Sequence, residues 1–400
     1  MTKFLAVSLS LVLSPLLAAQ TPNALPLPTP AQTSNAPVPP PPELTASNYV
    51  LMDYLTGRVL AEKKGDEQVV PASITKIMTS YVVAAEKKAG KIRPEDRVMI
   101  SENAWSGGGA GTDGSTSFLP VNQTVALSDL ELGMIVQSGN DASIALAEHV
   151  AGNEATFAAL MNQYGQKIGL KNSHFTNATG LFDPNHYSTA HDIGLLSQAL
   201  IRDFPDEYAL YKTKNFSFNG ITQGNRNLLL FRDPSVDGIK TGHLSQAGFC
   251  LAASAQRGDT RLISVVMNTA SEKVRAAESQ ALLEYGFRFF ETHKVYAASQ
   301  LITETNLWRG EAPKAKLGLA NDAMLTIPRG AYSRLEASMN IVQPLSAPLS
   351  KGQEVGKLNV KLDGALLLEQ PLVALEDYPE GGFFKRLSDS VWLWFDDGQE

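Results

Sequence analysis

The sequence of 400 residues contains one cysteine, Cys250, so no disulfide bond can form within the chain. A lone cysteine is usually buried and inert, and the apolar run Phe249–Ala252 around it predicts a core position in a strand. The six histidines form no HExxH pattern, and no CxxC pair is present. We therefore expect neither a metal site nor a cofactor.

The sequence also lacks an excess of positive charge, with 34 Lys and Arg against 41 Asp and Glu. The formal net charge is −7 and no long Lys/Arg run occurs, which argues against a nucleic-acid partner. The N-terminal apolar run, Phe4 to Ala19, follows a single lysine and is short and broken by Ser14-Pro15. These features favour a secretory signal peptide over residues 1–19 rather than a membrane span. The Pro-rich residues 20–46 cannot pack a core and predict an extended linker.

A chain of this length favours two folded domains. Residues 47–290 open with a predicted hairpin, Tyr49–Met52 and Arg58–Ala61, and a helix is expected to begin near Ser73. Further helices are expected at 127–137, 142–151, 155–168, 191–202 and 273–285, and strands at 248–254 and 261–267. Strands at both ends with helices between them indicate an α/β (α+β) domain, in which a helical cluster is inserted into a sheet.

The pattern of apolar and polar residues changes after residue 290. Lys357–Leu362 alternates apolar and polar residues, Asp363-Gly364 predicts a turn, and Ala365–Leu368 returns. We therefore predict a small all-β domain over residues 291–376.

Residues 377–400 predict a C-terminal amphipathic helix. Its apolar face comprises Phe383, Phe384, Leu387, Val391, Trp392, Leu393, Trp394 and Phe395. A face so rich in Trp and Phe favours binding to a membrane interface. The alternative is a helix docked on the β domain.

Three short motifs carry the chemistry. Ser73-Ile74-Thr75-Lys76 comes first, Ser138-Gly139-Asn140 second and Lys240-Thr241-Gly242 last. Each motif alone is weak evidence for a catalytic site, because Ser-x-x-Lys often marks a helix cap and Ser-Gly-Asn often marks a turn. Their joint order is the signature of penicillin-binding proteins and serine β-lactamases.

The motif residues suit acyl transfer through a serine. A hydroxyl needs an adjacent base to become nucleophilic, and Lys76 lies on the same helix face as Ser73. Lys76 can be that base only when neutral, which burial and a nearby cation such as Lys240 would favour. Ser138 is placed to relay a proton to the leaving amine, and Asn140 to hold Lys76 and the substrate backbone.

The substrate is expected along the third motif. Lys240 and Thr241 are predicted at the edge of a strand, where an extended peptide can add. The backbone N–H groups of Ser73 and His243 are the natural oxyanion hole.

Beyond the motifs, the sequence resembles the D-alanyl-D-alanine carboxypeptidases of the low-molecular-mass penicillin-binding proteins, the penicillin-binding protein 5 and 6 group. The resemblance runs from about Asn48 to the tail. It is carried by Pro71–Thr79, Gln137–Ala142, Val236–His243, Gly286–Thr292 and Leu325–Gly330, and by Pro379–Phe384 at the start of the family's membrane anchor.

The resemblance implies a penicillin-binding/serine β-lactamase-like transpeptidase domain in a periplasmic enzyme, attached peripherally to the outer face of the inner membrane. Such an enzyme removes the terminal D-alanine of peptidoglycan pentapeptides through an acyl-Ser73 intermediate and is acylated by β-lactams. Gly242 and His243 then join Asn140, Lys240 and Thr241 in substrate binding. Arg275 looks like a family arginine that binds the substrate carboxylate, although a surface arginine is an equal alternative.

The sequence departs from the family at two points. Leu244 stands where the family usually has threonine, and the tail ends in Asp396-Asp397-Gly398-Gln399-Glu400 where relatives carry basic or aromatic residues. Acidic residues are repelled by anionic lipid, so membrane binding is expected to be weak. The Gly- and Ser-rich segment 106–117 is expected to be a flexible loop beside the active site.

Three alternatives remain open. A class A β-lactamase would need a deacylating glutamate, but none occurs between Glu154 and Glu207, and Gly139 replaces the aspartate of those enzymes. An endopeptidase or transpeptidase of the same fold shares the motifs, and only the whole-chain resemblance favours the carboxypeptidase. A silent wall-binding protein would not need Ser73 and Lys76.

Overall fold

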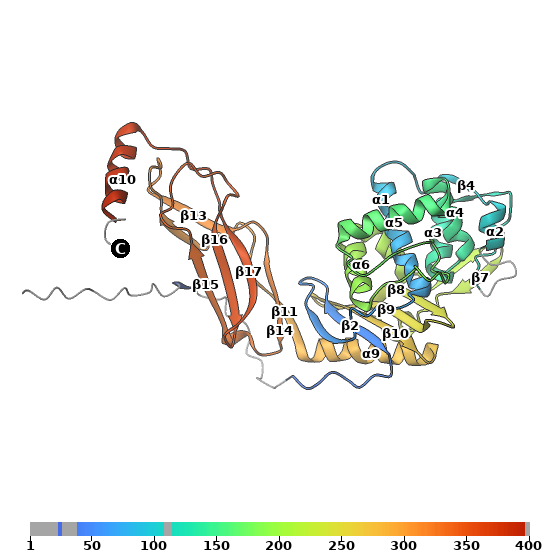
Figure 1. The fold of residues 1–400 in the computed structure, drawn as a ribbon. Helices are drawn as coiled ribbons and strands as arrows, with labels where there is room; N and C mark the ends of the chain where they lie inside the picture. The colour runs from blue at the N-terminus through green and yellow to red at the C-terminus, as the bar shows by residue number, and fades with distance from the viewer. Residues whose placement is uncertain (1–22, 26–37, 108–113, 397–400) are drawn as a thin grey trace, which may run out of the picture. The chain divides into compact units, whose positions relative to one another are not determined.

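The computed structural model describes residues 23–25, 38–107 and 114–396, and it divides into two compact units (Figure 1). The larger unit spans Gln32–His293 with Met324–Ala331, and the smaller unit contains Lys294–Ala323 and Tyr332–Glu400 together with the N-terminal Met1–Ala31. The predicted signal peptide, residues 1–19, lies outside the described residues.

A five-stranded antiparallel sheet forms the centre of the larger unit, in the order β3-β2-β10-β9-β8. Its strands are β2 (Asn48–Asp53), β3 (Val59–Lys63), β8 (Val236–Leu244), β9 (Gly248–Arg257) and β10 (Thr260–Thr269). The predicted hairpin and the two predicted central strands are thereby confirmed. β8, which carries the third motif, is an edge strand.

Both faces of this sheet are covered. Successive side chains of a strand point to opposite faces, and each face packs into its own core. Val50 and Met52 of β2 pack into one core beneath the helical cluster, whereas Tyr49 and Leu51 pack into a second core. Figure 1 shows α1, α5 and α6 on one side of the sheet and α9 (Glu272–Phe289) along the other. Cys250 is fully buried in the first core, as predicted.

The helical cluster lies between β3 and β8 in the sequence. It comprises α1 (Lys76–Lys88), α2 (Glu102–Gly107), α3 (Leu127–Leu132), α4 (Asn140–Ala151), α5 (Glu154–Ile168), α6 (Ala190–Asp203), α7 (Pro205–Tyr208) and α8 (Leu229–Arg232). Two small two-stranded sheets accompany it: β4 (Arg97–Met99) pairs with β5 (Thr124–Ala126), and β6 (Asn215–Phe218) forms a hairpin with β7 (Ile221–Gly224). The single helix expected at 127–137 is instead α3 followed by a π-helical turn over Gly133–Gln137.

Part of the predicted linker packs against the larger unit. The Glu278 carboxylate on α9 accepts hydrogen bonds from the backbone N–H groups of Thr45 (2.7 Å) and Ala46 (3.0 Å). The Tyr285 hydroxyl donates to the Pro39 carbonyl at 2.9 Å. Ordered structure on this unit therefore begins before the predicted start at residue 47.

The smaller unit is built on a six-stranded antiparallel sheet in the order β1-β15-β16-β17-β13-β12. Its strands are β1 (Asn23–Leu25), β12 (Thr303–Asn306), β13 (Lys314–Leu319), β15 (Leu335–Ile341), β16 (Glu354–Leu362) and β17 (Ala365–Ala374). The hairpin predicted around Asp363-Gly364 is confirmed as β16 and β17. β11 (Phe290–Tyr296) and β14 (Ala323–Pro328) lie where the chain passes from one unit to the other.

The C-terminal helix is α10 (Phe383–Asp396). Asp389 on this helix is buried, accepts a hydrogen bond from the backbone N–H of Arg309 at 2.7 Å and pairs with Lys385. Phe383, Phe384, Leu387, Val391 and Trp392 are exposed, while the side chains predicted at Leu393, Trp394 and Phe395 lie outside the described part. In the part of the chain that the structure describes, no helix is long and apolar enough to cross a membrane.

Candidate active site

The first motif lies in a short 3₁₀ turn, Ala72–Thr75, directly before α1. We expected Ser73 to begin an α-helix, but the α-helical hydrogen bonding starts only at Lys76. Side chains three residues apart eclipse one another in a 3₁₀ helix, so Lys76 lies beneath Ser73. Lys76 Nζ is 2.9 Å from Ser73 Oγ.

The surroundings of the Lys76 amine suit its neutral form. Lys76 is 1% exposed, and its Nζ lies 2.7 Å from both Asn140 Oδ1 and the Thr179 carbonyl oxygen. Both oxygens can only accept, so each takes one N–H. The third neighbour, the Ser73 hydroxyl, can donate its proton to the lone pair of a neutral amine.

Burial is the main cause that lowers the pKa of Lys76, to about 7, and the positive charge of Arg226 adds to it. The negative charges of Asp141 and Glu154 oppose this shift. The sequence had pointed to Lys240 as the neighbouring cation. The structure supplies Arg226 instead, while repulsion from Lys76, after burial, helps to hold the pKa of Lys240 well below its usual range.

Two glycines allow other segments to approach the Ser73 turn closely. A Cβ added to Gly242 of β8 would lie 3.0 Å from the Pro71 carbonyl oxygen. A Cβ at Gly180 would collide with the Ala72 carbonyl, and Gly180 has a φ of +83°. Ala72 itself has a φ of +49°, an uncommon conformation for a residue with a side chain and one often found at functional sites.

The second motif faces the first. Asn140 is the first residue of α4, and Ser138 ends the preceding π-helical turn in the left-handed region, with a φ of +66°. Ser138 is 3% exposed, and its Oγ has no hydrogen-bond partner among the described residues. A Cβ added at Gly139 would meet Ser117 Oγ and Asp141 Oδ1, so a larger residue there would require these side chains to shift.

The third motif and Arg275 form the opposite wall. Lys240 is buried and donates to the Thr241 carbonyl at 3.2 Å. Arg275 of α9 is 2% exposed, so the surface-arginine interpretation is wrong. Its Nη1 donates to the Gly242 carbonyl at 3.1 Å, and the His243 ring stacks on Phe249 with 4.0 Å between centroids.

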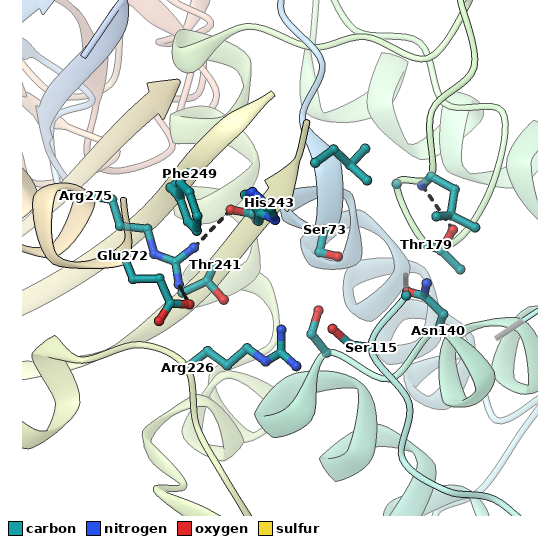
Figure 2. A pocket seen from close by; sticks show the side chains of 16 residues that line it. Ser73, Ser115, Asn140, Thr179, Arg226, Thr241, His243, Phe249, Glu272 and Arg275 are labelled. Atoms are coloured by element: carbon teal, nitrogen blue, oxygen red, sulfur yellow. Dashed lines mark hydrogen bonds and ion pairs between the residues drawn. The ribbon is translucent and has the colours of Figure 1, made fainter. Parts of the chain in front are cut away.

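These walls enclose a cavity of about 160 Å³. In Figure 2, Ser73 lies between Thr241, His243 and Arg275 on one side and Asn140 and Thr179 on the other. The cavity is lined by Ser73, Gly114, Ser115, Ser138, Asn140, Thr179, Gly180, Leu181, Arg226, Thr241, Gly242, His243, Leu244, Phe249, Glu272 and Arg275. Lys76 and Lys240 lie buried behind this lining.

Comparison with known proteins places this site in a family. Residues 33–271 match the family model described as D-alanyl-D-alanine carboxypeptidase. The chain belongs to the D-alanyl-D-alanine carboxypeptidase family. Residues 290–380 match the model described as penicillin-binding protein 5, C-terminal domain. The predicted fold class is confirmed, and the enzyme is a serine-type D-Ala-D-Ala carboxypeptidase, a hydrolase.

Similar proteins span nearly the whole chain. D-alanyl-D-alanine carboxypeptidase DacC of Escherichia coli is 46% identical over 88% of this chain and 89% of its own length. DacA of Haemophilus influenzae is 47% identical over 88% of this chain and 90% of its own length. The crystal structure of penicillin binding protein 5 from H. influenzae superposes with a TM-score of 0.82 at 46% identity, covering 85% of this chain and 99% of that one.

Sequence reasoning missed three residues of this carboxypeptidase site. Arg226 follows the β6–β7 hairpin and belongs to no motif, and Thr179 contributes only its backbone carbonyl to Lys76. Glu272 could have been found, because it precedes Arg275 by three residues, the spacing of an ion pair on a helix.

Proposed function

We propose that Ser73 is the nucleophile of this carboxypeptidase and Lys76 its general base. The observation that carries the proposal is the 2.9 Å contact between Lys76 Nζ and Ser73 Oγ, in which the amine is buried and its other two polar neighbours are acceptors. Neutral Lys76 takes the hydroxyl proton as Ser73 attacks the carbonyl carbon of the penultimate D-alanine.

We propose the following roles for the other groups of the site. The oxygen of the tetrahedral intermediate is held by the backbone N–H groups of Ser73 and His243. The C–N bond then breaks, and the amine of the leaving D-alanine receives the proton from Lys76 through Ser138, whose hydroxyl has no hydrogen-bond partner among the described residues and is free to relay it. Water next attacks the Ser73 ester and releases the shortened peptide.

Substrate binding is assigned to the opposite wall. The peptide extends along the edge strand β8, with Thr241, Gly242 and His243 lining its path and Asn140 contacting its backbone. Arg275, buried at the end of the cavity, binds the terminal carboxylate. Lys240 supplies positive charge from behind Thr241.

The same site would take β-lactams, which acylate Ser73 as mimics of the D-Ala-D-Ala dipeptide. Rapid hydrolysis of the acyl-enzyme is not expected. No glutamate is present between Glu154 and Glu207, and Gly139, which packs closely against Ser117, stands where class A β-lactamases have aspartate.

The test is release of D-alanine from a peptide ending in D-Ala-D-Ala. The unmodified protein should release it, and Ser73→Ala should release none while remaining folded by circular dichroism. Release by the variant at the parental rate would refute Ser73 as the nucleophile. No release by either protein would instead favour endopeptidase action or a scaffold.

We further infer a periplasmic location, with peripheral attachment to the outer face of the inner membrane through α10. Support comes from the apolar N-terminal run in the sequence and from the exposed aromatic side chains of α10. The amphipathic helix would lie in the interface rather than span it. The peptidoglycan pentapeptide is the expected physiological substrate.

A further inference from the structure

The cavity contains a carboxylate beside its buried arginine. Glu272 is the first residue of α9 and lines the cavity. Its Oε1 lies 3.0 Å from Nη2 of Arg275, one helical turn further on. Figure 2 shows this pair on the wall formed with Phe249 and Thr241, facing the space in front of Ser73.

The two partners differ sharply in exposure. The Arg275 side chain is 3% exposed and is also held by the Gly242 carbonyl, whereas the Glu272 side chain is 52% exposed. The guanidinium is therefore fixed, and the carboxylate can rotate into solvent at small cost. Burial lowers the pKa of Arg275, and Glu272 is the largest of the influences that oppose this shift. In the empty enzyme Glu272 thus neutralises a charge that burial makes unfavourable.

The C-terminal carboxylate of an incoming substrate meets the Arg275 guanidinium, which is already paired with the Glu272 carboxylate. A bidentate carboxylate takes N–H groups from two adjacent nitrogens of the guanidinium, and here Nη1 and Nη2 each already donate one of their two N–H groups. Two carboxylates on one guanidinium repel each other in a partly desolvated site. Glu272 must therefore move away or weaken the binding of the second carboxylate.

We propose that Glu272 is a displaceable internal carboxylate that occupies Arg275 in the empty site and sets the affinity for substrates ending in a free carboxylate. The proposal rests on the assignment of Arg275 to the substrate carboxylate. Glu272 acts through Arg275 and is a specificity-determining residue, not a participant in bond breaking. A substrate with a C-terminal amide gains nothing by displacing it.

The decisive variant is Glu272→Gln, which keeps the size of the side chain and removes its charge. We compare a peptide ending in D-Ala-D-Ala with the same peptide carrying a C-terminal amide. For the acid, KM should fall and kcat/KM should rise about three- to tenfold, the range of a half-exposed charge pair. The kcat for the acid and the kcat/KM for the amide should stay unchanged.

Glu67→Gln is a matched control. Glu67 lies in the same unit, is also 52% exposed and forms an ion pair of 3.0 Å with Lys64. This variant removes the same charge from a residue that does not line the cavity, so neither substrate should be affected. Equal gains in both variants would show a general effect of net charge and would overturn the proposal.

A double-mutant cycle separates this proposal from the assignment beneath it. Arg275→Gln alone should abolish the preference for the acid over the amide. If that preference survives, the assigned role of Arg275 fails. If it is lost but Glu272→Gln leaves the KM for the acid unchanged, only the role of Glu272 fails. The double variant should match Arg275→Gln, and any further gain from the Glu272 change in that background would contradict action through Arg275.

Discussion

Thr75, one residue before the proposed base Lys76, forms a hydrogen bond with a buried histidine from another segment. Its Oγ1 lies 2.8 Å from Nε2 of His186, and Nδ1 of the same ring accepts from the Thr176 backbone N–H at 3.1 Å. Because Nδ1 accepts, the proton of a neutral ring lies on Nε2 and is donated to Thr75. The ring can therefore accept from Thr176 and donate to the turn that carries Ser73 at the same time only while the imidazole is neutral.

The first prediction concerns stability in acid. Burial, followed by smaller repulsion from His174 and Lys76, lowers the pKa of His186 to about 4, and Asp183 opposes the shift. A lowered folded-state pKa gives stability that is complete above about pH 6.5 and is lost as pH falls towards 4, by roughly 3 kcal/mol. Urea unfolding between pH 4 and 7.5 should show this loss. His186→Gln, whose amide can accept and donate in the same places, should remove it.

Equal slopes for parent and variant over that range would contradict the prediction. Acylation by a fluorescent penicillin at pH 5 supplies a second reading. Since the charged ring cannot accept from Thr176, acylation by the parent should slow more than acylation by His186→Gln.

The second prediction concerns the pH profile of catalysis. With a Lys76 pKa of about 7, only the neutral fraction can act as base, so kcat/KM should rise through pH 7 as the amine loses its proton. Lys76→Arg keeps the positive charge but cannot deprotonate, and we expect activity to fall at least about 10³-fold. Stopped assays of D-alanine release from pH 5 to 9 check both. A flat profile through pH 7 would refute Lys76 as the base.

The residues in these predictions differ in whether they could be identified from the sequence alone. Ser73, Ser138 and Lys240 were found because short motifs fix their neighbours along the chain. The two central strands at 248–254 and 261–267 followed from hydrophobic pattern, and the β16–β17 hairpin followed from Asp363-Gly364. Local signals of this kind survive folding because they depend on residues only a few positions apart.

The rest could not be predicted, because it depends on contacts between distant segments. Arg226 reaches the cavity only through the path of the chain after the β6–β7 hairpin, and it replaced Lys240 as the cation that lowers the pKa of Lys76. The link from Thr75 to His186 likewise joins residues 111 positions apart. The periodicity of the sequence does not indicate which distant residues come into contact.

The third prediction tests the close approach at Gly180. Gly180→Ala should destabilise the protein by about 1 kcal/mol from its positive φ alone, and further because the new methyl group meets the Ala72 carbonyl. It should also slow acylation, because that carbonyl precedes Ser73. Gly152→Ala is the control, since Gly152 has a φ of +78° and no atom within 4 Å of an added Cβ. The control should lose stability only. Equal losses in both variants would show that the contact with Ala72 is unimportant.

The fourth prediction concerns a buried acidic pair away from the cavity. Glu131 of α3 and Glu207 of α7 share one cation, Lys87 of α1. Burial and the charge of Glu207 raise the pKa of Glu131 to about 7, against the opposing charge of Lys87. The folded protein thus retains a proton that the unfolded chain loses near pH 4.5, so stability falls as pH rises from 4.5 to 7. Glu131→Gln should flatten this fall and raise the melting temperature at pH 8. An unchanged pH dependence would contradict the raised pKa.

The fifth prediction tests the proposed membrane attachment. Asp389 ties one side of α10 to the Arg309 backbone, while Phe384 and Trp392 remain 84% and 67% exposed. Burying those two rings in an interface should contribute enough for their loss to weaken binding at least about tenfold. We therefore expect the double variant Phe384→Ser/Trp392→Ser to release the protein from phosphatidylethanolamine–phosphatidylglycerol vesicles in co-sedimentation.

Val342→Ser is the matched control, because Val342 lies in the same unit and is 66% exposed but is not part of α10. It should bind vesicles as the parent does, and all three proteins should release D-alanine from a soluble peptide at the same rate.

The residues from Asp396 to Glu400 include three acidic side chains. Their effect on membrane binding should depend on salt in the opposite sense from that of a basic anchor. Because salt screens their repulsion from anionic lipid, raising the ionic strength should strengthen binding. Binding that weakens with salt, or that survives the loss of both rings, would show that some other surface contacts the lipid.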